Sequence, residues 1–390
     1  MSTQVHNGLT GSRFVNMCVA NWFLHIYVYA IIPLLTCKVV LLGESEVWVG
    51  LSVLAFAIGM VLPGPFGAHL MERRSRKAIY LKALIVLGPI ATIGYIFAND
   101  VRSLLAIQLL QGVAYGVSQT ALGTTLVNDT LLSRQRNKGD IIYGWAGRIG
   151  IPLGLFLGYG LSLGIPVPQA YFWALIPCAL SFVLVAQTVV PIKAPVKVPL
   201  LTFDRFFLPR SLPLALSMFA APWVMGRVAG AFPKSESWLL GSAYVCLSLG
   251  VLMAFLVQLF IRRKVGQRAL IAIGYVFVVV GLILVSLPNL AIGNLGDLLL
   301  GGGIGAVSSR HLMDWVTKSA HCQRGTAQNT YLICWRWAFS LGLLCTCWCG
   351  FSNTIIDIVL CAVSLFLGVV PAFLKVPIIG FVVFFSLASP

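Results

Sequence analysis

The chain has 390 residues, of which 59% are hydrophobic and only 10% are charged. This composition excludes an ordinary water-soluble fold, because a soluble chain cannot hide so much apolar surface from water. The formal net charge of +16 is dispersed in basic clusters between apolar blocks, which excludes a nucleic-acid partner, since that would need a continuous basic surface.

The apolar residues fall into twelve blocks, each close to the ~20 residues that cross the hydrocarbon core of a bilayer. Backbone amides in lipid must find partners within their own segment, so we expect every block to be a helix. The predicted fold class is therefore an all-α integral membrane protein with twelve transmembrane helices. In chain order, the predicted spans are 14–37, 47–70, 78–98, 103–128, 141–164, 169–191, 211–231, 238–261, 269–288, 294–316, 327–350 and 354–374.

Lysine and arginine set the expected orientation of these spans, because they resist translocation. With the N-terminus inside, twenty of the 27 basic residues fall in cytoplasmic segments, three fall in outer loops and four lie inside spans. We therefore expect both termini in the cytoplasm. We interpret the membrane as a plasma membrane, namely the inner membrane of a bacterium.

A basic connector at 193–210 divides the chain into an N-terminal six-helix bundle, 1–192, and a C-terminal six-helix bundle, 211–390. The last stretch, 376–390, is an apolar tail to which we assign no function. The fifth and eleventh spans share the pattern R-x6-Y-x4-R-x5-G, which predicts a parallel repeat of the two halves. The matched pairs are Arg136 with Arg324, Tyr143 with Tyr331, Arg148 with Arg336 and Gly154 with Gly342.

The loop after the second span, residues 68–77, resembles the signature G-x-x-x-D-R-x-G-R-R of the major facilitator superfamily. Glu72 stands at the acidic position, Arg73 at the first basic position, and Arg76 with Lys77 at the closing pair. The resemblance implies two pseudo-symmetric six-helix bundles that move a small solute by alternating access, with no cofactor.

The charges of this loop also predict a gate at the cytoplasmic side, because its arginines can pair with an acid at a neighbouring helix end. Asp129, at the end of the fourth span, is the expected partner of the arginines in the first loop. A degenerate second copy of the loop runs from Arg263 to Arg268, and Asp314 is expected to pair with one of these two arginines. The alternative is that these are ordinary positive-inside loops with incidental acids.

The fourth span carries a polar face. Its residues 108–112 resemble the family's R-x-x-Q-G element, with Gln108 at the position of the arginine. In members of the family, this arginine is associated with proton coupling. This departure speaks against a standard proton antiport. Gln108, Gln111, Tyr115 and Gln119 share one broad face, so they are predicted to line a polar cavity or to bond neighbouring helices.

Four arginines lie inside predicted spans, where a charge costs roughly 2.5–3.5 kcal/mol and should face the bundle interior, water or a partner. Arg148 and Arg336 are candidates for substrate binding or gating, with packing against helix-end carbonyls as the alternative. Arg227 and Arg310 lie near span ends, where long side chains can reach the headgroup region. Because every acid lies at a span end or in a loop, we expect a positive central cavity, which favours an organic anion.

His25 lies near the middle of the first span, with Asn21 one turn earlier and Tyr29 one turn later on the same face. Asn21 and Tyr29 are further candidates for contact with the substrate. A histidine titrates near physiological pH, so His25 is a candidate proton carrier, and a neutral packing histidine is the alternative.

These observations predict a secondary active transporter of a small organic solute and not an enzyme. Its expected partners are the lipid bilayer and a small-molecule substrate, with a proton or another coupling ion left open; we expect a monomer without metal or cofactor. Two alternatives stay open: efflux of amphipathic, drug-like compounds, and an integral membrane enzyme that acts on lipid-linked substrates.

Overall fold

The computed structural model describes residues 8–190, 198–203, 206–231, 238–261, 266–287, 289–319, 323–349 and 354–369. The regular elements in these ranges are helices. The first part of the chain forms α1 (Ser12–Leu41), α2 (Val47–Val61), α3 (Gly64–Arg73), α4 (Arg76–Ile85), the π-helix η1 (Val86–Ile90), α5 (Ala91–Phe97), α6 (Val101–Ala121), the π-helix η2 (Leu122–Leu126), α7 (Val127–Thr130), the 3-10 turn η3 (Ser133–Gln135), α8 (Arg136–Gly164) and α9 (Val167–Gln187).

The second part forms a matching series of helices. It contains the 3-10 turn η4 (Pro209–Ser211), α10 (Leu212–Met218), α11 (Ala220–Gly230), α12 (Trp238–Ile261), α13 (Gln267–Val285), α14 (Leu290–Lys318), α15 (Arg324–Cys349) and α16 (Thr354–Val369). Each predicted span overlaps one of these helices or a consecutive run of them.

Among the described residues, seven helices are long and apolar enough to cross a membrane, or up to nine if each of two bent pairs is one span. The all-helical membrane fold is therefore confirmed, while the number twelve stays a prediction. The bent pairs are α2 with α3, at 49°, and α10 with α11, at 46°. Proline explains the second break, because Pro222 has no N–H to donate to the carbonyl of Met218, four residues earlier.

Glycines let neighbouring helices pack backbone to backbone. In α8, Gly150, Gly154 and Gly158 follow one another every four residues, and a Cβ added at each would come within 2.2–2.7 Å of a backbone oxygen of α1. Since no side chain fits there, α1 and α8 form one tightly packed pair.

The second half repeats this contact. A Cβ added at Gly342 of α15 would lie 2.2 Å from the backbone oxygen of Trp223 in α11. Gly154 and Gly342, which the sequence pairs, thus occupy corresponding contacts, α1 with α8 and α11 with α15. The boundaries of the two bundles stay a prediction.

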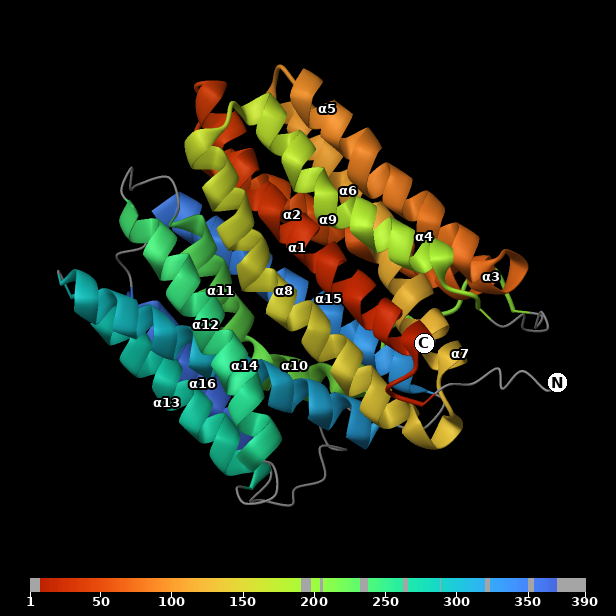
Figure 1. Cartoon of the computed structure of the whole chain (residues 1–390). Helices are drawn as coiled ribbons and strands as arrows, with labels where there is room; N and C mark the ends of the chain where they lie inside the picture. Colours follow the sequence, from red (N-terminus) through yellow and green to blue (C-terminus); the bar gives the residue numbers. More distant parts are fainter. Residues whose placement is uncertain are drawn as a thin grey trace, which may run out of the picture.

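The halves meet along α2 with α15 and along α8 with α12. The Ser340 hydroxyl of α15 donates to the carbonyl of Val53 in α2, at 3.2 Å. The rings of Trp145 in α8 and Phe255 in α12 lie 5.1 Å apart. Figure 1 shows α1, α8 and α15 crossing the middle of the molecule, and the candidate site is built where they meet.

Candidate functional site

Two arginines occupy matching positions in the central helices. Arg148 belongs to α8 and Arg336 to α15, and each lies about 18 Å along its helix from the first residue, at 1.5 Å per residue. Each side chain is only 3% exposed. The sequence repeat therefore places both charges deep inside the protein, near the contact between the halves.

Each of these arginines lies over aromatic rings of the opposite half. The guanidinium carbon of Arg148 is 4.6 Å from the ring centre of Tyr331 and 4.3 Å from that of Trp335, both in α15. Such cation–π contacts stabilise a desolvated guanidinium by about 2 kcal/mol. They also join α8 to α15.

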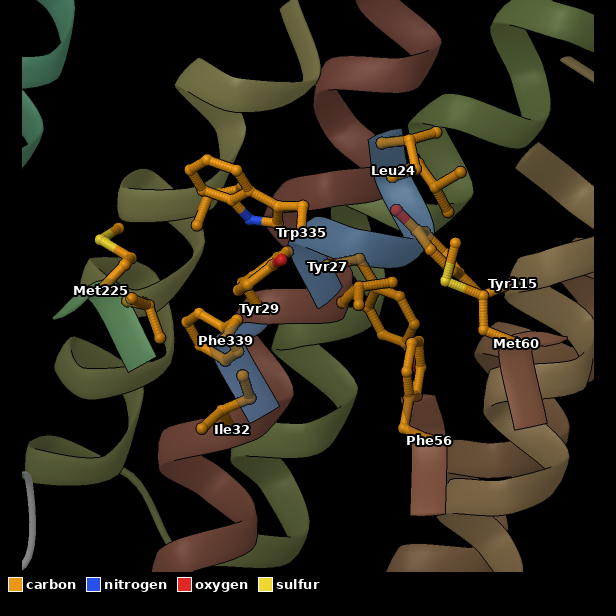
Figure 2. Close-up of a cluster of buried hydrophobic side chains, with 14 of the residues drawn as sticks. Leu24, Tyr27, Tyr29, Ile32, Phe56, Met60, Tyr115, Met225, Trp335 and Phe339 are labelled. Carbon is orange, nitrogen blue, oxygen red and sulfur yellow. The ribbon is translucent and has the colours of Figure 1, made fainter. Parts of the chain in front are cut away.

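Arg336 makes the reciprocal contacts, with rings of the N-terminal half. Its guanidinium carbon lies 4.7 Å from the ring centre of Tyr29 in α1 and 4.2 Å from that of Phe56 in α2, and it is 5.5 Å from Phe339 of its own helix. Figure 2 shows Tyr29 beside Trp335 and Phe339, in a wall of buried aromatic side chains. The two arginines therefore bind the halves to each other through rings and not through acids.

Both guanidiniums keep hydrogen-bond donors without a partner in the described part of the chain. These donors are Nε and Nη2 of Arg148 and Nε and Nη1 of Arg336, all of them buried. No described carboxylate forms an ion pair with either arginine. A buried donor that is left unpaired costs about 1–3 kcal/mol, and more when it is charged.

His25 lies within electrostatic reach of both guanidiniums. Its Nδ1 is 2.9 Å from the backbone oxygen of Asn21, and its Nε2 is 3.1 Å from the hydroxyl of Tyr115. Because a carbonyl oxygen only accepts, Nδ1 donates, and in the neutral ring Nε2 accepts from Tyr115. Both ring nitrogens of His25 are thus held by neutral groups.

A second set of polar residues is bound within the N-terminal half. The side chain of Asn21 donates to the carbonyl of Tyr143, at 3.0 Å, and accepts from Gln119, at 3.2 Å. The hydroxyl of Tyr143 donates in turn to Gln119, at 3.2 Å. These bonds fix α1, α6 and α8 to one another.

The other glutamines of the fourth span serve packing in this conformation. Gln111 accepts from the hydroxyl of Tyr95, at 2.7 Å, and donates to the backbone of Leu87 and to Tyr27. Gln108 is 2% exposed. The structure thus brings Tyr115 and Gln119 to the central cluster, whereas Gln111 bonds α1 and the third predicted span.

The first basic loop, residues 68–77, forms a charge cluster. Arg76 pairs with Asp129 and, at 3.0 Å, with Glu72, and its side chain is 9% exposed. Lys77 donates to the carbonyls of Ala186, at 2.5 Å, and Thr188, at 3.0 Å. A cavity of about 520 Å³ at the end of α3 is lined by Glu72, Arg76, Lys77 and Asp129, among others. Arg73 also lines this cavity and is exposed.

The second loop is different. Arg263 lies outside the described residues, and Arg268 is exposed at the start of α13. Among the described residues, the ion-pair partner of Asp314 is Lys318, one helical turn later, at 3.2 Å. This local pairing was not among the partners predicted from the sequence.

The structure corrects the expectation for Arg227. Its side chain does not reach the headgroup region but is 1% exposed and pairs with Asp357, at 3.2 Å. Trp223 donates to the same carboxylate, at 2.8 Å. Arg310 is likewise buried, with Nη1 3.7 Å from the sulfur of Met313.

Two of the aromatic partners were not identified from the sequence. Tyr331 carried a signal, because the repeat matches it to Tyr143, but nothing marked Phe56 or Phe339 as contacts of Arg336. A further omission is Asp297, an acid that is 6% exposed in α14 and lies beside Tyr244 of α12.

Comparison with known proteins gives a consistent result. The model of the Major Facilitator Superfamily matches residues 17–343. Among solved structures, the chain is similar to a mutant of the nucleoside transporter NupG (TM-score 0.65, 14% identity, 91% of this chain and 98% of that chain covered). It is also similar to the human organic anion transporter MFSD10 (TETRAN) (TM-score 0.63, 17% identity, 92% and 98% covered). A search of curated protein sequences found no significant match.

Proposed function

Because the chain belongs to the major facilitator superfamily and is a secondary transporter in a membrane, we propose that it carries a small organic anion by alternating access. The anion binds between the halves, at Arg148 and Arg336. The carrier then exposes this site to one side of the membrane at a time as the two halves rock.

The observation that carries this proposal is the pair of buried guanidiniums without acid partners. A buried charge that no group compensates is strongly destabilising, and buried charges are normally paired or hydrogen-bonded. Arg148 and Arg336 keep free donors instead, with rings packed against their faces. An anion supplies both the missing charge and the missing acceptors.

The same charges argue against export of cationic amphipathic compounds. The aromatic wall would suit such a molecule, but two uncompensated guanidiniums would repel its positive charge in a medium of low dielectric constant. Membership of a transporter family also stands against the alternative of an enzyme acting on lipid-linked substrates. The similarity to nucleoside and organic anion transporters, at 14–17% identity, supports the fold and adds nothing on the substrate.

We propose that the cytoplasmic cluster acts as the inner gate. The ion pair of Arg76 with Asp129 joins the ends of α3 and α4 to the end of α7, and it would open when the inner side opens. The proposed setting is a monomer in a bacterial inner membrane, with both termini in the cytoplasm. His25 is held by neutral partners, which supports a packing role over proton transfer.

Uptake into proteoliposomes tests the proposal. Purified protein is assayed with a panel of labelled organic anions and with cationic lipophilic drugs. Arg148→Gln and Arg336→Gln are compared with Arg102→Gln, whose arginine is exposed in the first turn of α6. We expect anion uptake that falls about tenfold or more in the first two variants and is unchanged in the third, as the loss of a charged hydrogen bond predicts.

A contrary result is easily recognised. If the protein transports a cationic compound and neither Arg148→Gln nor Arg336→Gln alters its rate, the anion proposal is wrong.

A further inference from the structure

The central site has a surplus of donors. Besides the four guanidinium N–H positions, the indole N–H of Trp335 is buried without a hydrogen-bond partner among the described residues. The nearby side chains of His25, Asn21 and Gln119 bond Tyr115 or each other and not the guanidiniums. A molecule that completes this site must therefore bring several acceptor atoms.

Both arginines offer free donors to a ligand. In a guanidinium, Nε–H and an N–H of Nη2 point the same way and form one edge, which matches the two oxygens of a carboxylate. Arg148 has this edge free. In Arg336, Nε and Nη1 are likewise buried without a partner among the described residues. Arg148 can thus hold a carboxylate side-on through two bonds, and Arg336 offers its own free donors to a second acidic group.

The balance of charge also indicates a ligand with two acidic groups. Two positive charges are buried, and no described acid pairs with either. A monoanion would neutralise one of them and leave the other uncompensated in a low-dielectric site, whereas a dianion would neutralise both.

We infer that the transported molecule carries two acidic groups, with one carboxylate held side-on by Nε and Nη2 of Arg148 and the second acidic group held by Arg336. The substrate class is an organic dianion of the dicarboxylate type. This inference rests on the proposed function, because it assigns the two ends of the anion within the same site.

Matched pairs of probes test the inference. Binding is measured by thermal shift and by titration on the full-length protein in nanodiscs of neutral phosphatidylcholine at pH 7, with succinate against its monoamide and phthalate against its monoamide. The members of each pair differ little in shape and by one charge. We expect the dianion to bind about tenfold to hundredfold more tightly than the monoamide, as one further charged hydrogen bond predicts.

Variants assign the two ends. Arg336→Gln should reduce the preference for the dianion to about equal affinity while the monoamide binds as before. Arg148→Lys should weaken both members, because an ammonium group keeps the charge but cannot offer the two-bond edge. Arg102→Gln serves as the control and should leave every affinity unchanged.

The outcomes separate the two proposals. If the wild-type protein binds each dianion and its monoamide equally, or binds only monoanions, the dianion inference fails while anion transport stands. If it binds no anion of either kind, in this series or in the uptake panel, the proposed function fails and this inference with it.

Discussion

Two kinds of buried arginine occur in the central helices. Arg227 of α11 has a side chain that is 1% exposed, and it pairs with Asp357, which is fully buried and also accepts from Trp223. Arg148 and Arg336 are 3% exposed, lie against rings and have no ion-pair partner among the described residues. Burial is nearly the same in the two cases, whereas charge compensation is opposite.

The comparison indicates which arginines hold the fold and which await a ligand. The ion pair of Arg227 with Asp357 fixes α11 to α16, and its two charges neutralise each other, so it does not need the charge of a substrate. Groups whose charge is not compensated are destabilising in the empty protein, and such groups are concentrated at functional sites. Stability and transport should therefore depend on different arginines.

The largest effect is expected on removal of the paired acid. Asp357→Ala leaves the charge of Arg227 buried and unpaired, so we expect the free energy of unfolding to fall by about 3–5 kcal/mol. Thermal unfolding of the purified protein measures it. Asp357→Asn is the matched variant, because its amide oxygen still accepts a hydrogen bond, and it should lose less. A melting temperature of Asp357→Ala equal to that of the wild type would remove the distinction between the two kinds of arginine.

Removal of an arginine without an ion-pair partner should affect transport and not stability. In Arg148→Met the protein loses cation–π contacts worth about 2 kcal/mol, but it also loses an uncompensated buried charge, so we expect an equal or higher melting temperature. Transport should be lost at the same time. If Arg148→Met melts as early as Asp357→Ala, then Arg148 holds the fold as Arg227 does.

Asp129 and Asp314, the acids near the two basic loops, allow the same comparison with smaller expected effects. Asp129 pairs with the 9% exposed Arg76, whereas Asp314 pairs with Lys318, which is 61% exposed. Asp129→Asn should favour the inward-open state by about 1 kcal/mol, or about fivefold, whereas Asp314→Asn should change little. Alkylation of a Leu312→Cys reporter measures this, because Leu312 is buried against Gly144 between the halves. Equal rates in both variants would argue against an inner gate at Asp129.

The smallest effect is expected for His25. Because both of its ring nitrogens are held by neutral groups, His25→Gln should leave the response of uptake to an imposed pH gradient unchanged. Uptake with and without the gradient is compared in the two proteins. Uptake that responds to the gradient in the wild type alone would restore His25 as a proton carrier.

Local patterns in the sequence were sufficient for the helices and for the position of the arginines. Hydrophobic blocks predicted where helices form, and the repeat placed Arg148 and Arg336 at equal depth. The partners of these arginines were not predictable, because Tyr331 is 183 positions from Arg148 and Phe56 is 280 from Arg336, and only tertiary packing brings them together.

Hydrogen bonds and ion pairs between distant helices explain the remaining predictions that the structure did not confirm. The sequence can place Gln111 and Gln119 on one face of a helix, but it cannot tell a side chain that lines a cavity from one whose donors and acceptors are taken by a neighbouring helix. Arg227 was misplaced for a related reason. Its depth suggested an escape to the headgroups, and the acid that holds it lies 130 residues away.

The exchange of arginines between the halves is reciprocal but not symmetric. Arg148 lies over two residues of the single helix α15, whereas Arg336 lies over one residue of α1 and one of α2. A repeated sequence has thus produced two buried charges with different aromatic surroundings. A molecule held between them, as we propose, would meet different rings at its two ends, so the site would distinguish the two orientations of an asymmetric substrate.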